Sequence, residues 1–308
     1  MKYIENLVLG SGISSFLYFR TADKKPKVFT SKGNKILKSK NFYENDTLGG
    51  NTNIWGGYIN LRRHKLFLKN KKYKKLFNKN VFKVNRIFSN SNNVKFENTY
   101  CLMNTNNEVF RINRKYFGNK IYEKKIKKIE IKNKNIEVSS DNSIFQVNKL
   151  ILCIGNLSLL KLLYQSNWLK KKDIISFDDG DCNYVFSFTA NNNKDYFIPM
   201  PLSNIAQKII FNKSKSYKVT KNNVILQKFS GTTKNYNFSC GDIMKMDDKK
   251  IRYFLSNHIA NLKINNIPVR KFIKSKLKKI NVFCTGTVKK YLPGPIIQDL
   301  ILDIIKNK

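Results

Sequence analysis

The chain opens with the stretch Tyr3-Ile4-Glu5-Asn6-Leu7-Val8-Leu9-Gly10-Ser11-Gly12-Ile13-Ser14-Ser15-Phe16-Leu17. The run Leu7–Leu9 is apolar at every position, which is typical of a parallel strand buried on both faces. Gly10-Ser11-Gly12 follows at once, and the apolar residues after it predict a helix that begins at Ile13. A strand, a glycine turn and a helix in this order predict a unit that binds a dinucleotide.

Each small residue of this turn has an expected role in such a unit. Gly10 allows the tight turn, and Gly12 lets a pyrophosphate approach the backbone beside Ser11. The helix from Ile13 then directs its free N–H groups and its positive dipole end at that phosphate. Ser15 replaces the third glycine of the pattern and still allows close packing of helix on strand. The alternative is a tight strand-to-helix turn with no ligand.

The second strand is predicted over residues 27–31. In dinucleotide-binding folds this strand commonly ends in Asp or Glu, which holds the ribose hydroxyls. Here the matching position is Ser31 or Thr30. Either hydroxyl offers a hydrogen bond to a ribose, but neither supplies the charge.

A glycine-rich loop follows at Leu48-Gly49-Gly50-Asn51-Thr52-Asn53-Ile54-Trp55-Gly56-Gly57. A loop with so few side chains lets its backbone approach a flat ligand closely. Its Asn and Thr residues offer hydrogen bonds, and Trp55 offers an apolar wall. The candidate ligand-contacting residues are Gly49, Gly50, Asn53, Trp55, Gly56 and Gly57. The alternative is a surface loop, although exposed loops seldom place a Trp between two glycine pairs.

Two further glycine-ended strands follow later in the chain. The alternation of apolar residues over 126–147 predicts a small antiparallel meander. It leads into a buried strand over 150–155 that ends at Gly155, and a Leu-rich helix comes next. A third buried strand over 280–286 stops at Gly286, and a last helix is predicted from about 296 to 305. Between them, short strand candidates at 184–189, 196–199 and 224–229 predict an antiparallel part that covers the substrate.

The formal net charge of +39 admits two explanations. The first is a polyanion partner such as nucleic acid or an anionic membrane surface. The second is compositional drift, since only eight of the 59 basic residues are Arg and the codons of Lys, Asn, Ile, Phe and Tyr are all A/T-rich. Nucleic-acid readers usually rely on Arg. We therefore favour drift and expect no specific nucleic-acid partner, while a peripheral contact with an anionic surface stays open.

The five cysteines lie far apart and the chain has only two histidines, His64 and His258. Because no Cys-x-x-Cys pattern occurs, we expect no metal site. An odd number of unpatterned cysteines fits a reducing compartment, so we expect a cytoplasmic protein. The sequence contains no run of 18 apolar residues, so we expect no membrane span. The first nine residues do not resemble a signal peptide.

Taken in order, these motifs resemble the glucose–methanol–choline (GMC) family of FAD-dependent oxidoreductases. The likeness rests on Gly10-x-Gly12, the loop 48–57, the segment 150–155 with its Leu-rich helix, and the segment 282–286 before the last helix. It is strongest for the branch of the family with a Gly-Gly-Ser-Ser-Asn-x-Trp-Gly-Gly-type loop.

The resemblance implies an α/β protein with a glutathione-reductase-like, Rossmann-type FAD-binding domain and a smaller α+β substrate domain on an antiparallel sheet. The FAD-binding domain is expected over residues 1–60, 120–168 and 256–308. The substrate domain, or cap, is expected over 61–119 and 169–255. Members of the family oxidise alcohols, often sugar or sterol hydroxyls, and the electron acceptor of this chain is left open.

The resemblance also implies a catalytic base. Asn257-His258-Ile259-Ala260-Asn261-Leu262-Lys263-Ile264 resembles the family's His-containing stretch, and His258 falls on the catalytic histidine. Imidazole suits a base because its unperturbed pKa is about 6.5. The second catalytic position falls on Gly294, which leaves two alternatives to an active alcohol oxidoreductase: a catalytically impaired protein that keeps the flavin fold, and a polyanion-binding protein.

Overall fold

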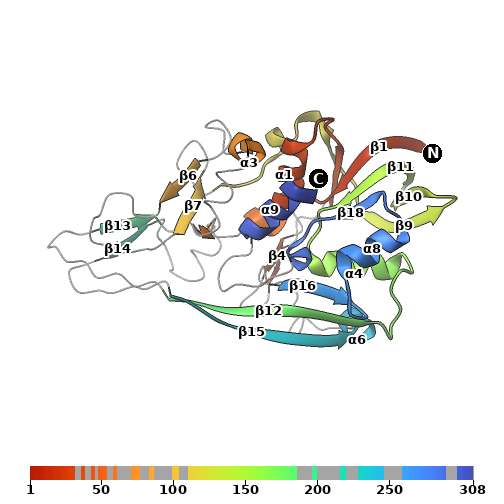
Figure 1. Ribbon diagram of the computed structural model, residues 1–308. Helices are drawn as coiled ribbons and strands as arrows, with labels where there is room; N and C mark the ends of the chain where they lie inside the picture. Colours follow the sequence, from red (N-terminus) through yellow and green to blue (C-terminus); the bar gives the residue numbers. More distant parts are fainter. Residues whose placement is uncertain are drawn as a thin grey trace.

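The computed structural model describes residues 1–31, 36–38, 43–45, 48–53, 58–60, 71–76, 83–86, 99–103, 110–185, 196–199, 216–219, 228–245, 259–288 and 297–307. Within these residues the chain is a mixed α/β protein (Figure 1). It has one large sheet with parallel and antiparallel strands and a separate antiparallel sheet.

Within the described part of the chain, the large sheet has seven strands. The strand order is β8-β2-β1-β11-β10-β9, and β18 pairs with β11. The bounds are β1 (Lys2–Leu9), β2 (Lys27–Thr30), β8 (Ile121–Glu123), β9 (Ile126–Lys132), β10 (Asn135–Ser140), β11 (Ser143–Leu152) and β18 (Ile280–Val282). The predicted strands at 7–9, 27–31, 150–155 and 280–286 and the predicted meander are confirmed, although the strands stop short of their glycines.

Strand β11 belongs to both the parallel and the antiparallel part of this sheet. Its first half, from Ser143 to Val147, pairs antiparallel with β10, and its last three residues, Leu150–Leu152, pair parallel with β18. Along most of its length it also pairs parallel with β1. The five parallel strands therefore run β8-β2-β1-β11-β18, and the chain order reverses between β1 and β11. Such a switch point is where open α/β sheets bind ligands, beyond the carboxyl ends of the strands.

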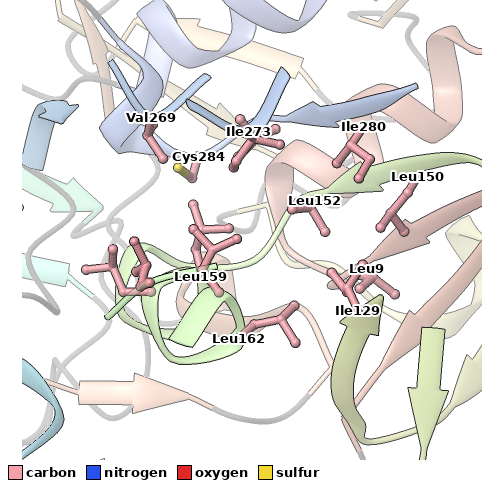
Figure 2. Close-up of a cluster of buried hydrophobic side chains, with 14 of the residues drawn as sticks. Leu9, Ile129, Leu150, Leu152, Leu159, Leu162, Val269, Ile273, Ile280 and Cys284 are labelled. Atoms are coloured by element: carbon pink, nitrogen blue, oxygen red, sulfur yellow. The ribbon is translucent and has the colours of Figure 1, made fainter. Parts of the chain in front are cut away.

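Helices cover both faces of the parallel strands. Because side chains alternate along a strand, Leu7 and Leu9 enter a core with α4 and α8, whereas Val8 enters a second core with α1 and α9. Figure 2 shows part of the first core, where Leu9, Leu152 and Ile280 of the sheet lie near Leu159 and Ile273. The bounds are α1 (Ile13–Thr21), α4 (Asn156–Gln165), α8 (Val269–Lys276) and α9 (Ile297–Asn307). The last helix agrees with its prediction, and α8 was not predicted.

The second sheet packs against the core that contains α4 and α8. Its strand order is β15-β12-β16-β17, with β12 (Ile174–Val185), β15 (Lys228–Ser239), β16 (Ile259–Ile264) and β17 (Ile267–Pro268). In Figure 1, β12 and β15 form the long ribbon along the lower edge. The candidate at 196–199 is confirmed as β13 (Tyr196–Pro199). The candidate at 184–189 overlaps the end of β12 and the candidate at 224–229 overlaps the start of β15, while residues 186–189 and 224–227 lie outside the described residues. Both strands extend beyond the predicted bounds, because β12 begins at Ile174 and β15 continues to Ser239.

The remaining elements are short. They are β3 (Ile36–Lys38), β4 (Tyr43–Asn45), η1 (Gly50–Asn53), β5 (Tyr58–Asn60), α3 (Lys71–Leu76), β6 (Lys83–Arg86), β7 (Thr99–Met103), η2 (Arg114–Tyr116), η3 (Gly118–Lys120), β14 (Ser216–Val219), α6 (Cys240–Met244) and η4 (Thr285–Thr287). The second sheet joins β16, from the expected FAD-binding segments, to strands of the expected cap. The domain boundaries stay a prediction. None of the described helices is long and apolar enough to cross a bilayer.

An ion pair fastens the last helix to the sheet. Arg270 of α8 donates through both terminal nitrogens to the carboxylate of Asp303 on α9, and it also donates to the Val282 carbonyl at 3.2 Å. Thr287 Oγ1 adds a bond of 3.1 Å to Asp303. The two charged side chains are 19% and 15% exposed, so water screens the pair little.

Asp303→Asn should lower the free energy of unfolding by about 2 kcal/mol, because it replaces a charge-assisted network and leaves Arg270 without a counter-charge. Chemical denaturation measures the change. Lys24→Met is the matched control, since the Lys24–Glu5 pair is 79% and 55% exposed and its loss should leave the unfolding curve nearly unchanged. Equal effects of the two variants would contradict this role for Asp303.

Candidate cofactor site

The turn after β1 packs closely against the backbone that follows the neighbouring strand β11. Gly10 has a φ of 101°, a backbone conformation that L side chains rarely adopt. A Cβ atom at Gly10 would lie 2.4 Å from the carbonyl oxygen of Cys153, which follows β11. The Gly10 N–H donates to the Phe29 carbonyl at 2.8 Å, and the Cys153 N–H donates to the Leu9 carbonyl at 2.8 Å. The first glycine therefore lets the ends of β1, β2 and β11 meet.

The N-terminus of α1 opens directly after this turn. Gly12 is its N-cap and supplies no capping side chain. The N–H of Ile13 instead donates to Thr52 Oγ1 of the glycine-rich loop at 2.9 Å. The N–H groups of Ser14 and Ser15 belong to the first turn, where no earlier helical carbonyl can accept them. Such a turn is a ready site for an anion.

A methyl group would fit in front of Gly12. A Cβ atom there would lie 3.4 Å from Thr52 Oγ1 and 3.7 Å from the Gly49 carbonyl oxygen, which are ordinary contact distances. Packing alone would thus accept alanine at this position. Ser15 is fully buried, and within the described residues its hydroxyl has no hydrogen-bond partner. A clear cradle and an orphaned hydroxyl in one helical turn fit a polar ligand at this end of α1.

Hydroxyl groups connect the first two strands to the loop. Ser11 Oγ lies 2.8 Å from Thr30 Oγ1 at the end of β2 and accepts the N–H of Gly49 at 3.0 Å. Thr52 accepts from Ile13, and its own N–H donates to the Gly49 carbonyl at 3.2 Å. The loop residues Gly49 and Thr52 are therefore held against the phosphate-binding turn that the sequence predicts. Ser31 follows β2 directly and is half-buried.

Asn53 secures the other side of the loop. Its side-chain amide donates to the carbonyls of Leu48 and Ile112 at 2.9 and 2.8 Å, and its oxygen accepts the Ile112 N–H at 2.7 Å. The same amide lies where a side chain at Gly49 would have to be, 2.2 Å from a Cβ built there. Asn53 thus has a structural role that the sequence did not indicate. Its predicted contact with a cofactor stays a prediction, as does that of Gly50.

The two later glycines lie at the same edge of the sheet. Gly155 is the N-cap of α4, just beyond β11, and a Cβ atom on it would meet no atom of the described chain within 4 Å. Gly286 lies beyond β18, and its N–H donates to Asn156 Oδ1 at 3.0 Å. Asn156 also donates to Thr285 Oγ1 at 2.7 Å. The carboxyl ends of β11 and β18 are therefore joined beside the end of β1.

The interior behind this edge is apolar and neutral. Burial raises the pKa of the Cys284 thiol to about 12, and burial raises the pKa of Cys153 well above its ordinary value. Burial likewise raises the pKa of Tyr18, on α1, to about 12. All three groups stay protonated at neutral pH, so none of them places a negative charge behind the helix end.

The strand that follows His258 lies against this edge. Asn261 of β16 donates its N–H to the Val288 carbonyl at 2.6 Å, just after η4, and its side-chain amide donates to Asp178 Oδ2 at 3.1 Å. Ala260 is fully buried in the core that α1 and α9 share. His258 itself lies outside the described residues, as do Trp55, Gly56 and Gly57.

The structure thus brings most of the described candidate residues to one edge of one sheet. They are Gly10, Ser11, Gly12, Ser15, Ser31, Gly49, Gly50, Gly155 and Gly286. It adds Thr52, whose hydroxyl touches the helix end. An N-cap glycine without a capping side chain was the available signal, because it leaves the first N–H groups of the helix to partners from other segments or to a ligand.

Comparisons with known proteins give distant structural similarity. No family model and no curated protein matches the chain. The open form of NikD, an unusual amino acid oxidase, shares 10% identity over 98% of this chain and 95% of that chain, with a TM-score of 0.39. Pyridoxine 4-oxidase from Mesorbium loti shares 8% over 98% of both chains, with a TM-score of 0.43.

A ferredoxin-flavin thioredoxin reductase from Clostridium acetobutylicum is also similar, at 13% identity and a TM-score of 0.25. The match covers 50% of this chain and 38% of that reductase. These TM-scores are too low to define the fold, which follows instead from the strand order and the registers above.

Gly10→Ala should lower the free energy of unfolding by about 2 kcal/mol or more, because a methyl group would meet the Cys153 carbonyl and φ is positive. Gly155→Ala is the matched control, since it also places a methyl group after a parallel strand but meets open space. Thermal unfolding of both variants tests the difference. A Gly10→Ala protein as stable as Gly155→Ala would mean that the ends of β1 and β11 do not meet closely.

Proposed function

We propose that the chain is an FAD-dependent oxidoreductase of the GMC type that oxidises the CH–OH group of an alcohol, with sugar hydroxyls as the first substrates to test. The observation that carries the proposal is the convergence of Gly10-Ser11-Gly12, Gly155 and Gly286 at the carboxyl ends of adjacent parallel strands. This edge contains the switch point at which α/β sheets bind dinucleotides. The oxidoreductases and the flavin-containing reductase among the similar structures are in keeping with it.

The residues of the edge fit a dinucleotide. The N–H groups of Ser14 and Ser15 and the dipole of α1 would hold the pyrophosphate, in front of the side-chain-free Gly12. Thr52 Oγ1 accepts from Ile13 and keeps its own proton to donate to a phosphate oxygen. At Gly155 an added Cβ atom would meet no atom of the described residues within 4 Å, so the rest of the cofactor could approach the backbone here.

The chemistry divides between cofactor and protein. FAD, when bound, supplies the acceptor for the hydride that leaves the alcohol carbon. The protein must orient the alcohol and remove its hydroxyl proton, and His258 is the base we propose for this. Strand β16 begins one residue after His258 and is bonded to Val288 beside η4. This backbone link places β16 beside the cofactor edge, and the role of His258 as the base stays a prediction from the sequence.

The purified full-length protein should bind FAD and show the visible absorption bands of a flavin. Gly12→Ala should keep the thermal stability of the parent protein, because its methyl group has room, and should bind FAD at least about tenfold more weakly, because the methyl group occupies the phosphate cradle. Titration of the FAD-free protein measures both affinities. A protein that takes up no FAD would overturn the proposal. Unchanged FAD affinity in Gly12→Ala would place the pyrophosphate elsewhere.

His258→Ala should lower the rate of alcohol-dependent flavin reduction by about 10²- to 10⁴-fold, the usual contribution of a general base. Stopped-flow reduction under anaerobic conditions, with a panel of sugars and simple alcohols, provides the measurement. His64→Ala is the control, as it alters the chain's other histidine. If flavin binds but no alcohol reduces it in the parent protein, the catalytically impaired alternative is supported. An unchanged rate in His258→Ala would remove this residue from the mechanism.

A further inference from the structure

The end of β2 lacks the usual ribose partner. In dinucleotide-binding folds a carboxylate at this place accepts hydrogen bonds from the ribose hydroxyls of the adenosine half. Here β2 ends at Thr30, followed by Ser31. The Thr30 hydroxyl is buried and bonded to Ser11 Oγ at 2.8 Å. The end of β2 therefore offers no acid to the sugar of a nucleotide bound at the proposed site.

The neighbouring strand supplies an acid at the same level of the sheet. Strand β8 runs parallel to β2, and Glu123 is the register partner of Thr30. The ladder continues past both residues, because the Lys124 N–H donates to the Thr30 carbonyl at 2.8 Å. Among the described residues that end or directly follow the five parallel strands, Glu123 is the only acid.

Glu123 also faces the side of the sheet that carries α1. Side chains alternate along a strand, so Glu123 points the same way as Ile121 of β8. Ile121 and its register partner Val28 both pack in the core that contains α1. Glu123 therefore lies on the face whose first helix begins with the phosphate-binding turn.

The carboxylate of Glu123 is free to take a ligand. Its side chain is 47% exposed, and one oxygen lies 3.3 Å from Arg114 Nη1, which belongs to a side chain that is 63% exposed. An exposed pair of this kind holds a side chain only weakly. The pair with Arg114 therefore leaves this exposed carboxylate available to a sugar hydroxyl.

We propose that Glu123 is the ribose-binding carboxylate, so that the acid for the adenosine sugar has moved from the end of the second parallel strand to the end of the third. The assignment rests on the proposed function, since it concerns the same nucleotide site. It makes Glu123 a determinant of nucleotide specificity, by which the site distinguishes an adenosine ribose from a deoxyribose.

Displacement of FAD from the full-length protein by ADP, 2′-deoxy-ADP and 3′-deoxy-ADP tests the assignment, with recovery of flavin fluorescence as the signal. The parent protein should bind ADP about tenfold more tightly than at least one deoxy analogue, because a hydrogen bond to a charged acceptor is lost. Glu123→Gln should bind ADP more weakly and lose most of this ratio. A deoxy analogue that binds as well as ADP to the parent protein would overturn the assignment.

Two control variants separate the sugar contact from other effects of the substitution. Arg114→Gln breaks the same ion pair but keeps the carboxylate, so its ratio of ADP to deoxy-ADP affinity should match that of the parent protein. Glu130→Gln removes an acid of β9 that pairs with Lys128, and it should also keep the ratio. An Arg114→Gln or Glu130→Gln protein that loses this affinity ratio as Glu123→Gln does would overturn the assignment.

The failure of this inference can be told from the failure of the proposed function. If FAD binds but the affinity ratio does not depend on Glu123, this inference fails while the proposed function stands. If no FAD binds, both fail.

Discussion

The close approach of β1 and β11 constrains everything else in this protein. The carbonyl of Cys153 comes so near to Gly10 that no side chain fits between them. That contact fixes the switch point between the two halves of the parallel sheet and aligns the ends of β2, β1, β11 and β18. The glycine turn, the N-terminus of α1 and the open space beside Gly155 are all placed by it. The proposed cofactor site is thus a consequence of how two strands meet.

A second layer of order comes from hydroxyl groups. The Ser11 hydroxyl bonds to Thr30 and accepts the N–H of Gly49, and the Thr52 hydroxyl accepts the N–H of Ile13. These bonds hold the glycine-rich loop against the N-terminus of α1. Asn53 then fixes the loop to the backbone at Ile112. Polar atoms of this kind need partners when they are buried. The loop is therefore as much a part of the fold as of the candidate site.

The parts that the sequence predicted correctly share one property: a strong local pattern. The apolar runs at 7–9, 150–155 and 280–286 and the alternating residues of the meander each define a strand by themselves. The beginning of β12 was missed because Asp178 and Asp179 interrupt its apolar residues. Helix α8 was missed although Val269, Phe272 and Ile273 have the spacing of an apolar helix face. Thr52 and Glu123 depend on contacts between distant segments, and no periodicity carries such information. For Trp55 and His258, which lie outside the described residues, sequence alone still provides the assignment.

The double pairing of β11 has a consequence for how the protein is assembled during synthesis. Its first half can form the meander with β9 and β10 as soon as these neighbouring residues have left the ribosome. The strand must then pair with β1, made much earlier, along most of its length, and its last three residues must wait for β18, made much later. Contacts between such distant segments form slowly, because long loops must close first. Helix α1 therefore gains its complete supporting sheet only after β18 has been made, which gives chaperones a long interval in which to act.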